Sequence, residues 1–159
     1  MIEAGDSVRN PRPPLGAMVA KALAAARASP NRVRQVGAVL LTCNGAEIGA
    51  CNTFPGGVHS LDERCEGEAR FVWMEHAERR AIFAAARRGV ATQGGHLTTT
   101  FFPCIDCARA IVDCGIACLD TPAPLFSDPV WGDDFARSQA ILEEGGVEVR
   151  IVEDRAPQP

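Results

Sequence analysis

Two short motifs constrain this chain more than any other feature: H-A-E at residues 76–78 and P-C-I-D-C at residues 103–107. A catalytic zinc site takes three protein ligands and one water, and histidine and cysteine are common ligands. We therefore expect His76, Cys104 and Cys107 to bind Zn²⁺ as the cofactor. Glu78 lies two residues after His76, which is too close on a helix for both side chains to ligate one ion comfortably. We expect Glu78 to be the catalytic base beside the metal.

Each motif alone has other interpretations. His76 could cap or pack a helix, and Glu78 could simply favour the dipole of the helix that it begins. The C-x-x-C pair could be a redox pair or half of a zinc ribbon. A redox pair needs no His-x-Glu partner, and a ribbon needs a second C-x-x-C, which the sequence lacks. Both motifs together, with a proline before the first cysteine, resemble the signature of zinc deaminases that act on nucleobases.

The chemistry of such a site explains the spacing. Cys104 and Cys107 begin an expected helix, whose dipole and free N–H groups favour thiolates. A water bound to zinc has its pKa lowered from about 15.7 towards about 7. We expect Glu78 to take a proton from this water, which attacks the amine-bearing carbon of the ring. Glu78 then returns protons to the ring nitrogen and to the departing ammonia, a role that contributes about 10²–10⁴-fold.

The hydrophobic pattern predicts an α/β chain. Helices are expected over 15–29, 74–88, 104–114 and 135–144, and strands over 36–42, 46–51, 95–102, 116–119 and 147–152. Residues 52–73 and 120–134 show little periodicity and are expected to be irregular. Later strands alternate with helices, which predicts a mixed sheet covered on both faces. We expect a flexible leader over 1–13, one zinc-dependent deaminase domain over 14–153, and a disordered tail over 154–159.

Composition excludes several classes of protein. The chain has no apolar run long enough to span a membrane and no charged-then-apolar signal pattern, so a cytoplasmic location is expected. The net charge of −4 provides no basic footprint for nucleic acid, which favours a small-molecule substrate. Seven cysteines are an odd number, and those outside the zinc site are expected to be free thiols in a reducing compartment.

From about residue 15 to residue 152 the chain resembles deoxycytidylate (dCMP) deaminases of the cytidine deaminase superfamily. The resemblance is carried by five stretches: Q-V-G-A-V at 35–39, N-T-F-P-G-G at 52–57, H-A-E with A-I at 76–82, F-P-C-I-D-C-A at 102–108, and C-G-I at 114–116. It implies the cytidine deaminase fold, a three-layer α/β/α sandwich around a five-stranded mixed sheet. It also implies hydrolytic deamination, most simply of dCMP to dUMP, and a homo-oligomer.

The resemblance also assigns residues that bind the substrate. It implies that Asn52 contacts the sugar and that Phe54 belongs to the same loop. Trp131 could stack on the base or only cover the edge of the core. The chain departs from the family at Arg80, where an asparagine is common, and at Arg34, where threonine or serine is common. It also has no tyrosine, which the family tends to carry near 127–132. These departures concern the substrate pocket and leave the metal ligands intact.

Several interpretations stay open on the sequence alone. The substrate could instead be a free base, a nucleoside or another aminated heterocycle such as guanine or a pterin, and the chain could be a catalytically silent zinc protein. Intact Glu78 argues against the silent protein, because a structural zinc does not need it. His59 and Cys65 could belong to a second zinc site or be ordinary loop residues. Four arginines are candidates for gripping a phosphate: Arg32, Arg34, Arg64 and Arg70.

Overall fold

A computed structural model describes residues 12–153 of the chain. The expected tail, 154–159, and all but the last two residues of the expected leader, 1–13, lie outside the described residues.

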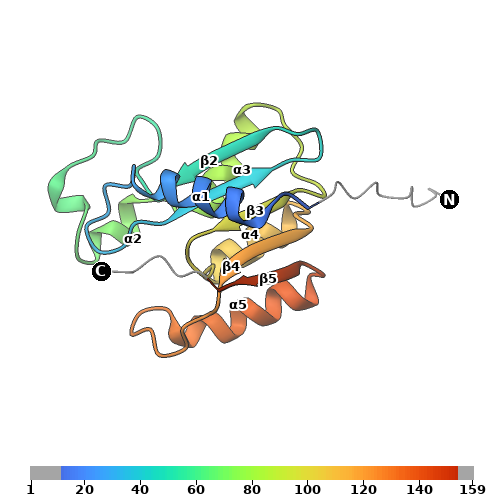
Figure 1. Cartoon of the computed structure of the whole chain (residues 1–159). Coiled ribbons are helices and arrows are strands. Elements are labelled where there is room, and N and C mark those ends of the chain that lie inside the picture. Colours follow the sequence, from blue (N-terminus) through green and yellow to red (C-terminus); the bar gives the residue numbers. More distant parts are fainter. Residues whose placement is uncertain (1–11, 154–159) are drawn as a thin grey trace.

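Five strands form one mixed sheet, as the sequence predicts (Figure 1). The strands are β1 (Gly37–Leu41), β2 (Glu47–Cys51), β3 (His96–Thr99), β4 (Cys118–Pro122) and β5 (Glu148–Val152). Their order across the sheet is β2-β1-β3-β4-β5. β1 is antiparallel to both β2 and β3, whereas β3, β4 and β5 run parallel. The parallel strands need crossover connections, and helices provide them.

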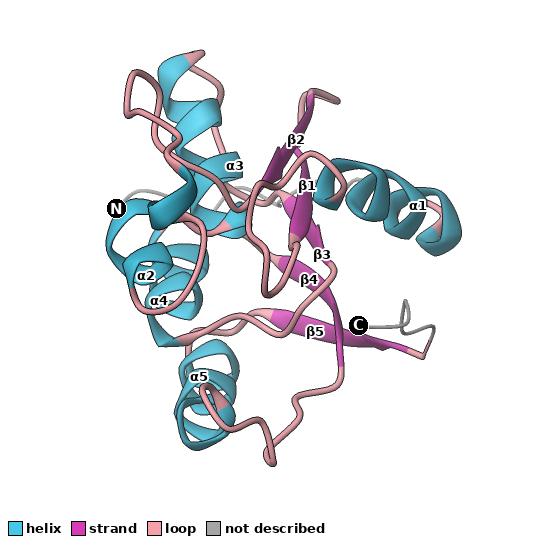
Figure 2. Ribbon diagram, turned by 90° about the vertical axis from the view of Figure 1, so that its left-hand side faces the viewer, coloured by secondary structure: helices cyan, strands magenta, loops and turns pink. Residues whose placement is uncertain are grey.

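Helices cover both faces of the sheet and complete the three layers (Figure 2). α1 (Leu15–Ala26) lies alone on one face, against β1, β2 and β3. The opposite face carries α3 (Ala77–Arg87), α4 (Ile105–Asp113) and α5 (Gly132–Glu144). The short α2 (Ala69–Trp73) and a 3₁₀ turn, η1 (Asp62–Arg64), lie in the long connection after β2. The expected α/β/α sandwich is therefore confirmed.

Strand β1, the second in the sheet order, is buried on both sides, and its successive side chains point into two different parts of the core. Ala38 and Leu40 point into the main core, which includes Ala81 of α3, while Val39 packs with Met18 of α1 on the other face. Such a strand is nearly continuous in hydrophobic residues, because both of its faces meet helices. The two helical layers are thus held to the sheet through the same strand.

Several expected boundaries are wrong. α5 begins at Gly132 instead of residue 135, α1 ends at Ala26 instead of residue 29, and β3 ends at Thr99 instead of residue 102. In two further cases a tertiary contact overrides the local pattern. The helix expected from residue 74 begins at Ala77, because Glu75 forms an isolated antiparallel bridge with Thr53. The strand expected over 116–119 lies at Cys118–Pro122, because Asp120 and its neighbours pair with β5. The segment expected to be irregular over 52–73 contains η1 and α2.

Candidate active site

The starts of two helices bring the three expected metal ligands together. His76 has extended backbone at the N-cap of α3, Cys104 does the same at the N-cap of α4, and Cys107 lies in the first turn of α4. The Nδ1 atom of His76 lies 3.4 Å from the Cys104 Sγ and 3.5 Å from the Cys107 Sγ. All three ligand atoms lie within 4.8 Å of one another.

These distances fit zinc. Bond lengths of about 2.3 Å to sulfur and 2.0–2.1 Å to nitrogen, at a tetrahedral angle, place nitrogen and sulfur about 3.5 Å apart. One imidazole and two thiolates leave the fourth position for a water or a substrate atom, as catalytic zinc sites require. No other cluster of three or more histidine, cysteine and acidic side chains with this geometry occurs within residues 12–153. His59 and Cys65 therefore do not form part of such a group in the described chain.

Hydrogen bonds and burial shift the pKa values of the two thiols in opposite directions. The pKa of Cys104 is lowered to about 4, first by the hydrogen bond with Cys107 and then by that with His76. The pKa of Cys107 is raised well above its ordinary value, by the same partnership with Cys104 and by burial. Burial alone would lower the pKa of His76, but the hydrogen bond with Cys104 and the charge of Glu78 outweigh it and raise that pKa.

Glu78 is placed for proton transfer. It lies in the first turn of α3, is only 3% exposed, and lines the same pocket as His76 and Cys104. Burial raises the pKa of its carboxyl group above the ordinary value. A carboxyl group whose pKa moves towards neutrality can both accept and return a proton under ordinary conditions. The position and environment of Glu78 match the role of a base beside the metal.

A pocket with a cavity volume of about 180 Å³ opens above the metal ligands. Its walls come from five parts of the chain and are largely apolar; the apolar residues include Val36, Phe71, Met74, Phe102 and Trp131. Polar side chains lie among them: Asn31, Arg34, Asn52, Arg70 and Asp128. A mostly apolar concave site with a few converging polar groups is the usual form of a small-molecule site.

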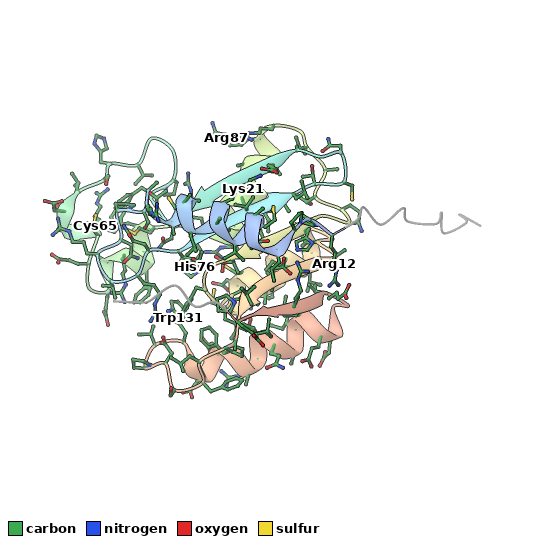
Figure 3. The ribbon with its side chains drawn as sticks, viewed as in Figure 1. Arg12, Lys21, Cys65, His76, Arg87 and Trp131 are labelled. Atoms are coloured by element: carbon green, nitrogen blue, oxygen red, sulfur yellow. The ribbon has the colours of Figure 1, made fainter. Side chains whose placement is uncertain are left out.

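Trp131, one of the expected substrate-binding residues, lines this pocket beside the metal ligands. It immediately precedes α5, and its ring lies edge-to-face with that of His76, with centroids 5.6 Å apart (Figure 3). It makes a second edge-to-face contact, also at 5.6 Å, with Phe71 of α2. The indole therefore forms part of the pocket wall next to the metal ligands, and it also packs against the main core.

The other two expected substrate-binding residues are placed differently. Asn52 is buried and lines the pocket; its Oδ1 accepts from the Val36 amide at 2.8 Å and its Nδ2 donates to the Arg34 carbonyl at 2.9 Å. One amide proton and one lone pair remain for a substrate. Phe54 is not among the residues that line the pocket, because its side chain packs with Cys65 and Met74 in a small separate core.

The structure separates the four candidate arginines. Arg34 and Arg70 line the pocket, whereas Arg32 pairs with Asp62 at 2.9 Å and Arg64 lies over the Trp73 ring at 3.6 Å. Arg34 is engaged by Asp128, at 2.9 Å. For Arg70, no carboxylate within residues 12–153 lies at ion-pair distance; its guanidinium lies 4.1 Å from the centroid of the Phe71 ring. Arg70 is the pocket arginine without a carboxylate partner among the described residues, and its guanidinium donates a hydrogen bond to the Gly67 carbonyl.

Sequence reasoning missed Phe71 and Asp128. Phe71 lies on α2, in a segment expected to be irregular, and no motif points to it. Asp128 had a weak signal, because an aspartate before proline and a helix start is typical of a turn that its side chain caps. Its Oδ1 indeed accepts from the Val130 and Trp131 amides, both at 2.9 Å.

Comparison with known proteins agrees with this fold and site. The family model of the cytidine and deoxycytidylate deaminase zinc-binding region matches residues 14–119. An uncharacterized deaminase in the luxG 3′ region of Aliivibrio fischeri is 33% identical over 118 residues, which are 72% of this chain and 77% of that protein. The deoxycytidylate deaminase of Enterobacteria phage T2 is 39% identical over 75 residues, 46% of this chain but only 36% of the phage protein.

Solved structures share the fold. The apo dCMP deaminase of cyanophage S-TIM5 superposes with a TM-score of 0.69 at 23% identity, covering 86% of this chain and 95% of that one. The same phage protein in complex with dCMP and dUMP gives 0.62 at 22% identity, covering 87% and 93%. Fold and site together define a zinc hydrolase with a cytidine-deaminase architecture. The chain belongs to the cytidine and deoxycytidylate deaminase family and is a zinc-dependent deaminase.

Among the described residues, no helix combines the length and the apolar character needed to cross a membrane.

Proposed function

We propose that this chain converts dCMP and water to dUMP and ammonia. The observation that carries the proposal is one pocket in which His76, Cys104 and Glu78 share a cavity with apolar aromatic walls and with Arg70, which has no carboxylate partner among the described residues. The metal ligands and Glu78 support hydrolysis, the aromatic walls fit a flat ring, and Arg70 fits a phosphate. No other described part of the chain combines these three features.

The residues of the chain divide the chemistry. His76, Cys104 and Cys107 hold the zinc, which supplies activation of water as a nucleophile when it is bound. Glu78 accepts a proton from the attacking water and gives it to the ring nitrogen next to the amine-bearing carbon. The second proton of the water leaves with the amine as ammonia. The apolar walls around Glu78 keep bulk water away from these transfers.

The pocket offers partners for each part of a nucleotide. Trp131 and Phe71 provide aromatic surface beside His76, where a pyrimidine ring has to approach the metal. Asn52 keeps one donor and one acceptor site for the sugar. Arg70 can form a charge-assisted hydrogen bond with the phosphate, and such bonds are shorter and stronger than neutral ones. The phage deoxycytidylate deaminases to which the chain is similar act on this class of substrate by name, which supports the same assignment.

The test is a substrate panel of dCMP, CMP, deoxycytidine, cytosine, guanine and an aminopterin, assayed side by side by ammonia release. We expect dCMP to give the highest kcat/KM. Loss of the phosphate, as in deoxycytidine, should lower kcat/KM about ten- to a hundredfold, the range for losing a hydrogen bond to a charged group.

Arg70→Met sharpens this test. The variant should lower kcat/KM for dCMP about ten- to a hundredfold and leave kcat/KM for deoxycytidine nearly unchanged. Arg32→Met is the matched control, because Arg32 is exposed, paired with Asp62 and outside the pocket. If deoxycytidine, a free base or a pterin equals or exceeds dCMP, the alternative of a deaminase for a substrate without phosphate replaces the nucleotide proposal. One observation favours this alternative. The other three candidate arginines already contact a carboxylate or an aromatic ring of the protein itself.

A further inference from the structure

The carboxylate of Asp128 links two segments that line the pocket through its hydrogen bonds. Its side chain is 2% exposed, and it accepts three hydrogen bonds. One oxygen accepts from the Val130 and Trp131 amides at 2.9 Å each, and the other accepts from the Arg34 guanidinium at 2.9 Å. Burial alone would raise the pKa of Asp128, but these amides and the charge of Arg34 lower it, so the group is ionised.

Besides its pair with Asp128, Arg34 makes three further contacts, one through its guanidinium and two through its backbone. Its guanidinium lies 4.2 Å from the centroid of the Phe101 ring. Its backbone amide donates to the Asn31 side chain at 3.0 Å, and its carbonyl accepts from Asn52 at 2.9 Å. Arg34 therefore joins the segment before β1 to the loop before α5, and both segments line the pocket.

The third part of the arrangement is the Trp131 ring. The backbone amide that Asp128 holds belongs to the residue whose indole lies edge-to-face with His76 and with Phe71. A fixed backbone at Trp131 therefore fixes a wall next to a metal ligand.

We infer that Arg34 is a positioning residue: through its ion pair with Asp128 it holds Trp131 against His76 and so fixes the orientation of the substrate ring over the metal. This inference rests on the proposed deaminase function, and it assigns Arg34 to the wall of the pocket rather than to the phosphate. The physical reason is charge balance. The carboxylate of Asp128 is buried, so removing Arg34 leaves an uncompensated buried charge. We expect the loop that carries Asp128 and Trp131 to relieve this cost by moving towards solvent.

The first experiment measures Trp131 directly, without substrate. Trp73→Phe in the full-length, zinc-loaded protein leaves Trp131 as the one tryptophan, because the chain has two. On this background, Arg34→Met and Asp128→Asn should each shift the fluorescence emission to longer wavelength, as the indole gains solvent. Arg32→Met, in the same segment and also paired with a carboxylate, should leave the emission unchanged. Unchanged emission in Arg34→Met overturns the inference.

The second experiment separates positioning from phosphate binding. Because a misplacement of about 1 Å can cost about a hundredfold, Arg34→Met should lower kcat about ten- to a hundredfold, with a smaller change in KM. The loss should be the same for dCMP and deoxycytidine, since the ring and not the phosphate is misplaced. A loss confined to dCMP would instead make Arg34 a phosphate ligand and would overturn the inference.

A double substitution and a conservative one complete the test. Arg34→Met with Asp128→Asn should lose no more activity than the worse single variant, because residues that act as a unit are not additive. Additive losses contradict the inference. Arg34→Lys keeps the charge and should recover both the emission and part of kcat. If no cytosine compound is a substrate, the proposed function fails while the emission shifts still report whether Arg34 positions Trp131.

Discussion

At the scale of single residues, we propose different roles for the three metal ligands and for Glu78. His76, Cys104 and Cys107 present their ligand atoms within 4.8 Å of one another, while Glu78 is buried in the same pocket outside this set. A carboxylate that does not ligate the metal can be changed without losing the metal. The two roles can therefore be separated by substitution.

We expect Glu78→Gln to retain one zinc per chain and to lose about 10²–10⁴-fold in kcat/KM, because the amide cannot carry a proton. Cys104→Ala should lose both zinc and activity. Metal analysis of the purified variants, together with ammonia release, checks both results. Glu143→Gln, an exposed change on α5, is the control. A Glu78→Gln variant within about tenfold of wild-type activity would show that another group moves the proton.

At the scale of elements, the packing of α1 on β1 depends on a missing side chain. A Cβ atom on Gly37 of β1 would lie 1.9 Å from the Ala22 carbonyl oxygen and 2.6 Å from the Ala26 amide nitrogen. Both are backbone atoms of α1 and cannot move aside alone. A Cβ on Gly49 of the adjacent β2 would meet nothing within 4 Å.

Gly37→Ala should therefore lower the free energy of unfolding by at least about 1–3 kcal/mol, the cost of overpacking a core. Gly49→Ala is the matched control and should be neutral or stabilising by about 0.5–1 kcal/mol, since glycine weakens a strand. Urea unfolding of the two variants measures the difference. Equal stabilities would mean that α1 can separate from the sheet without cost.

A buried ionic network joins the parallel strands on the α1 face of the sheet. Asp120 of β4 accepts two hydrogen bonds from Arg150 of β5, both 2.7 Å long, and one from the Nε2 of His96 in β3, also 2.7 Å. Burial alone would raise the pKa of Asp120, but the hydrogen bonds with His96 and Arg150 lower it from 3.8 to about 2. A lowered folded-state pKa contributes stability above the unfolded pKa and loses it as the pH falls.

Asp120→Asn should thus remove about 2 kcal/mol of pH-dependent stability, using about 1.4 kcal/mol per pKa unit. We expect the gap in unfolding free energy between wild type and variant to be full above about pH 4 and to narrow as the pH falls towards 2. Urea unfolding from pH 6 to pH 2.5 measures this gap. Asp134→Asn, which breaks an exposed pair with Arg137, should show almost no gap. A gap for Asp120→Asn that does not change with pH would contradict the linkage.

At the scale of the whole molecule, exposed apolar side chains gather around α2 and the loop before α5, which lie on the same side in Figure 1 and touch through Phe71 and Trp131. Val72 is 77% exposed, Phe126 57% and Val130 50%. Exposed apolar groups of this kind often mark an interface with another chain. The expected homo-oligomer stays a prediction, as does the expected cytoplasmic location.

We expect light scattering at micromolar concentration to give a homo-oligomer, and Val72→Glu to shift it to smaller species, because a charge in an apolar interface has to be desolvated. Val33 is half-exposed and lines the pocket from the segment before β1, so Val33→Glu tests whether the effect is local to α2. A monomeric wild-type protein would rule the prediction out.

The sequence by itself determined the class of fold and the cluster of His76, Cys104 and Cys107, and it predicted Glu78 as the base beside them. These follow from motifs in which each residue acts locally: His76 and Cys104 at helix starts, Cys107 one turn further, and alternation of strands with helices. The beginning of α3 was misjudged by three residues because the bridge between Glu75 and Thr53 joins segments that lie far apart in the chain.

Only the tertiary structure decided the walls of the pocket. Asp120 belongs to a strand because Arg150 and His96 compensate its buried charge, and local pattern cannot reveal partners on other strands. Phe54 matches a substrate loop in sequence but packs away from the pocket, whereas Phe71, which belongs to no motif, contacts Trp131. Arg34 and Asp128 are 94 residues apart, and only folding brings their charges together. Metal chemistry is encoded within a few adjacent residues, but a pocket wall is assembled from distant segments, so its composition depends on how the elements pack.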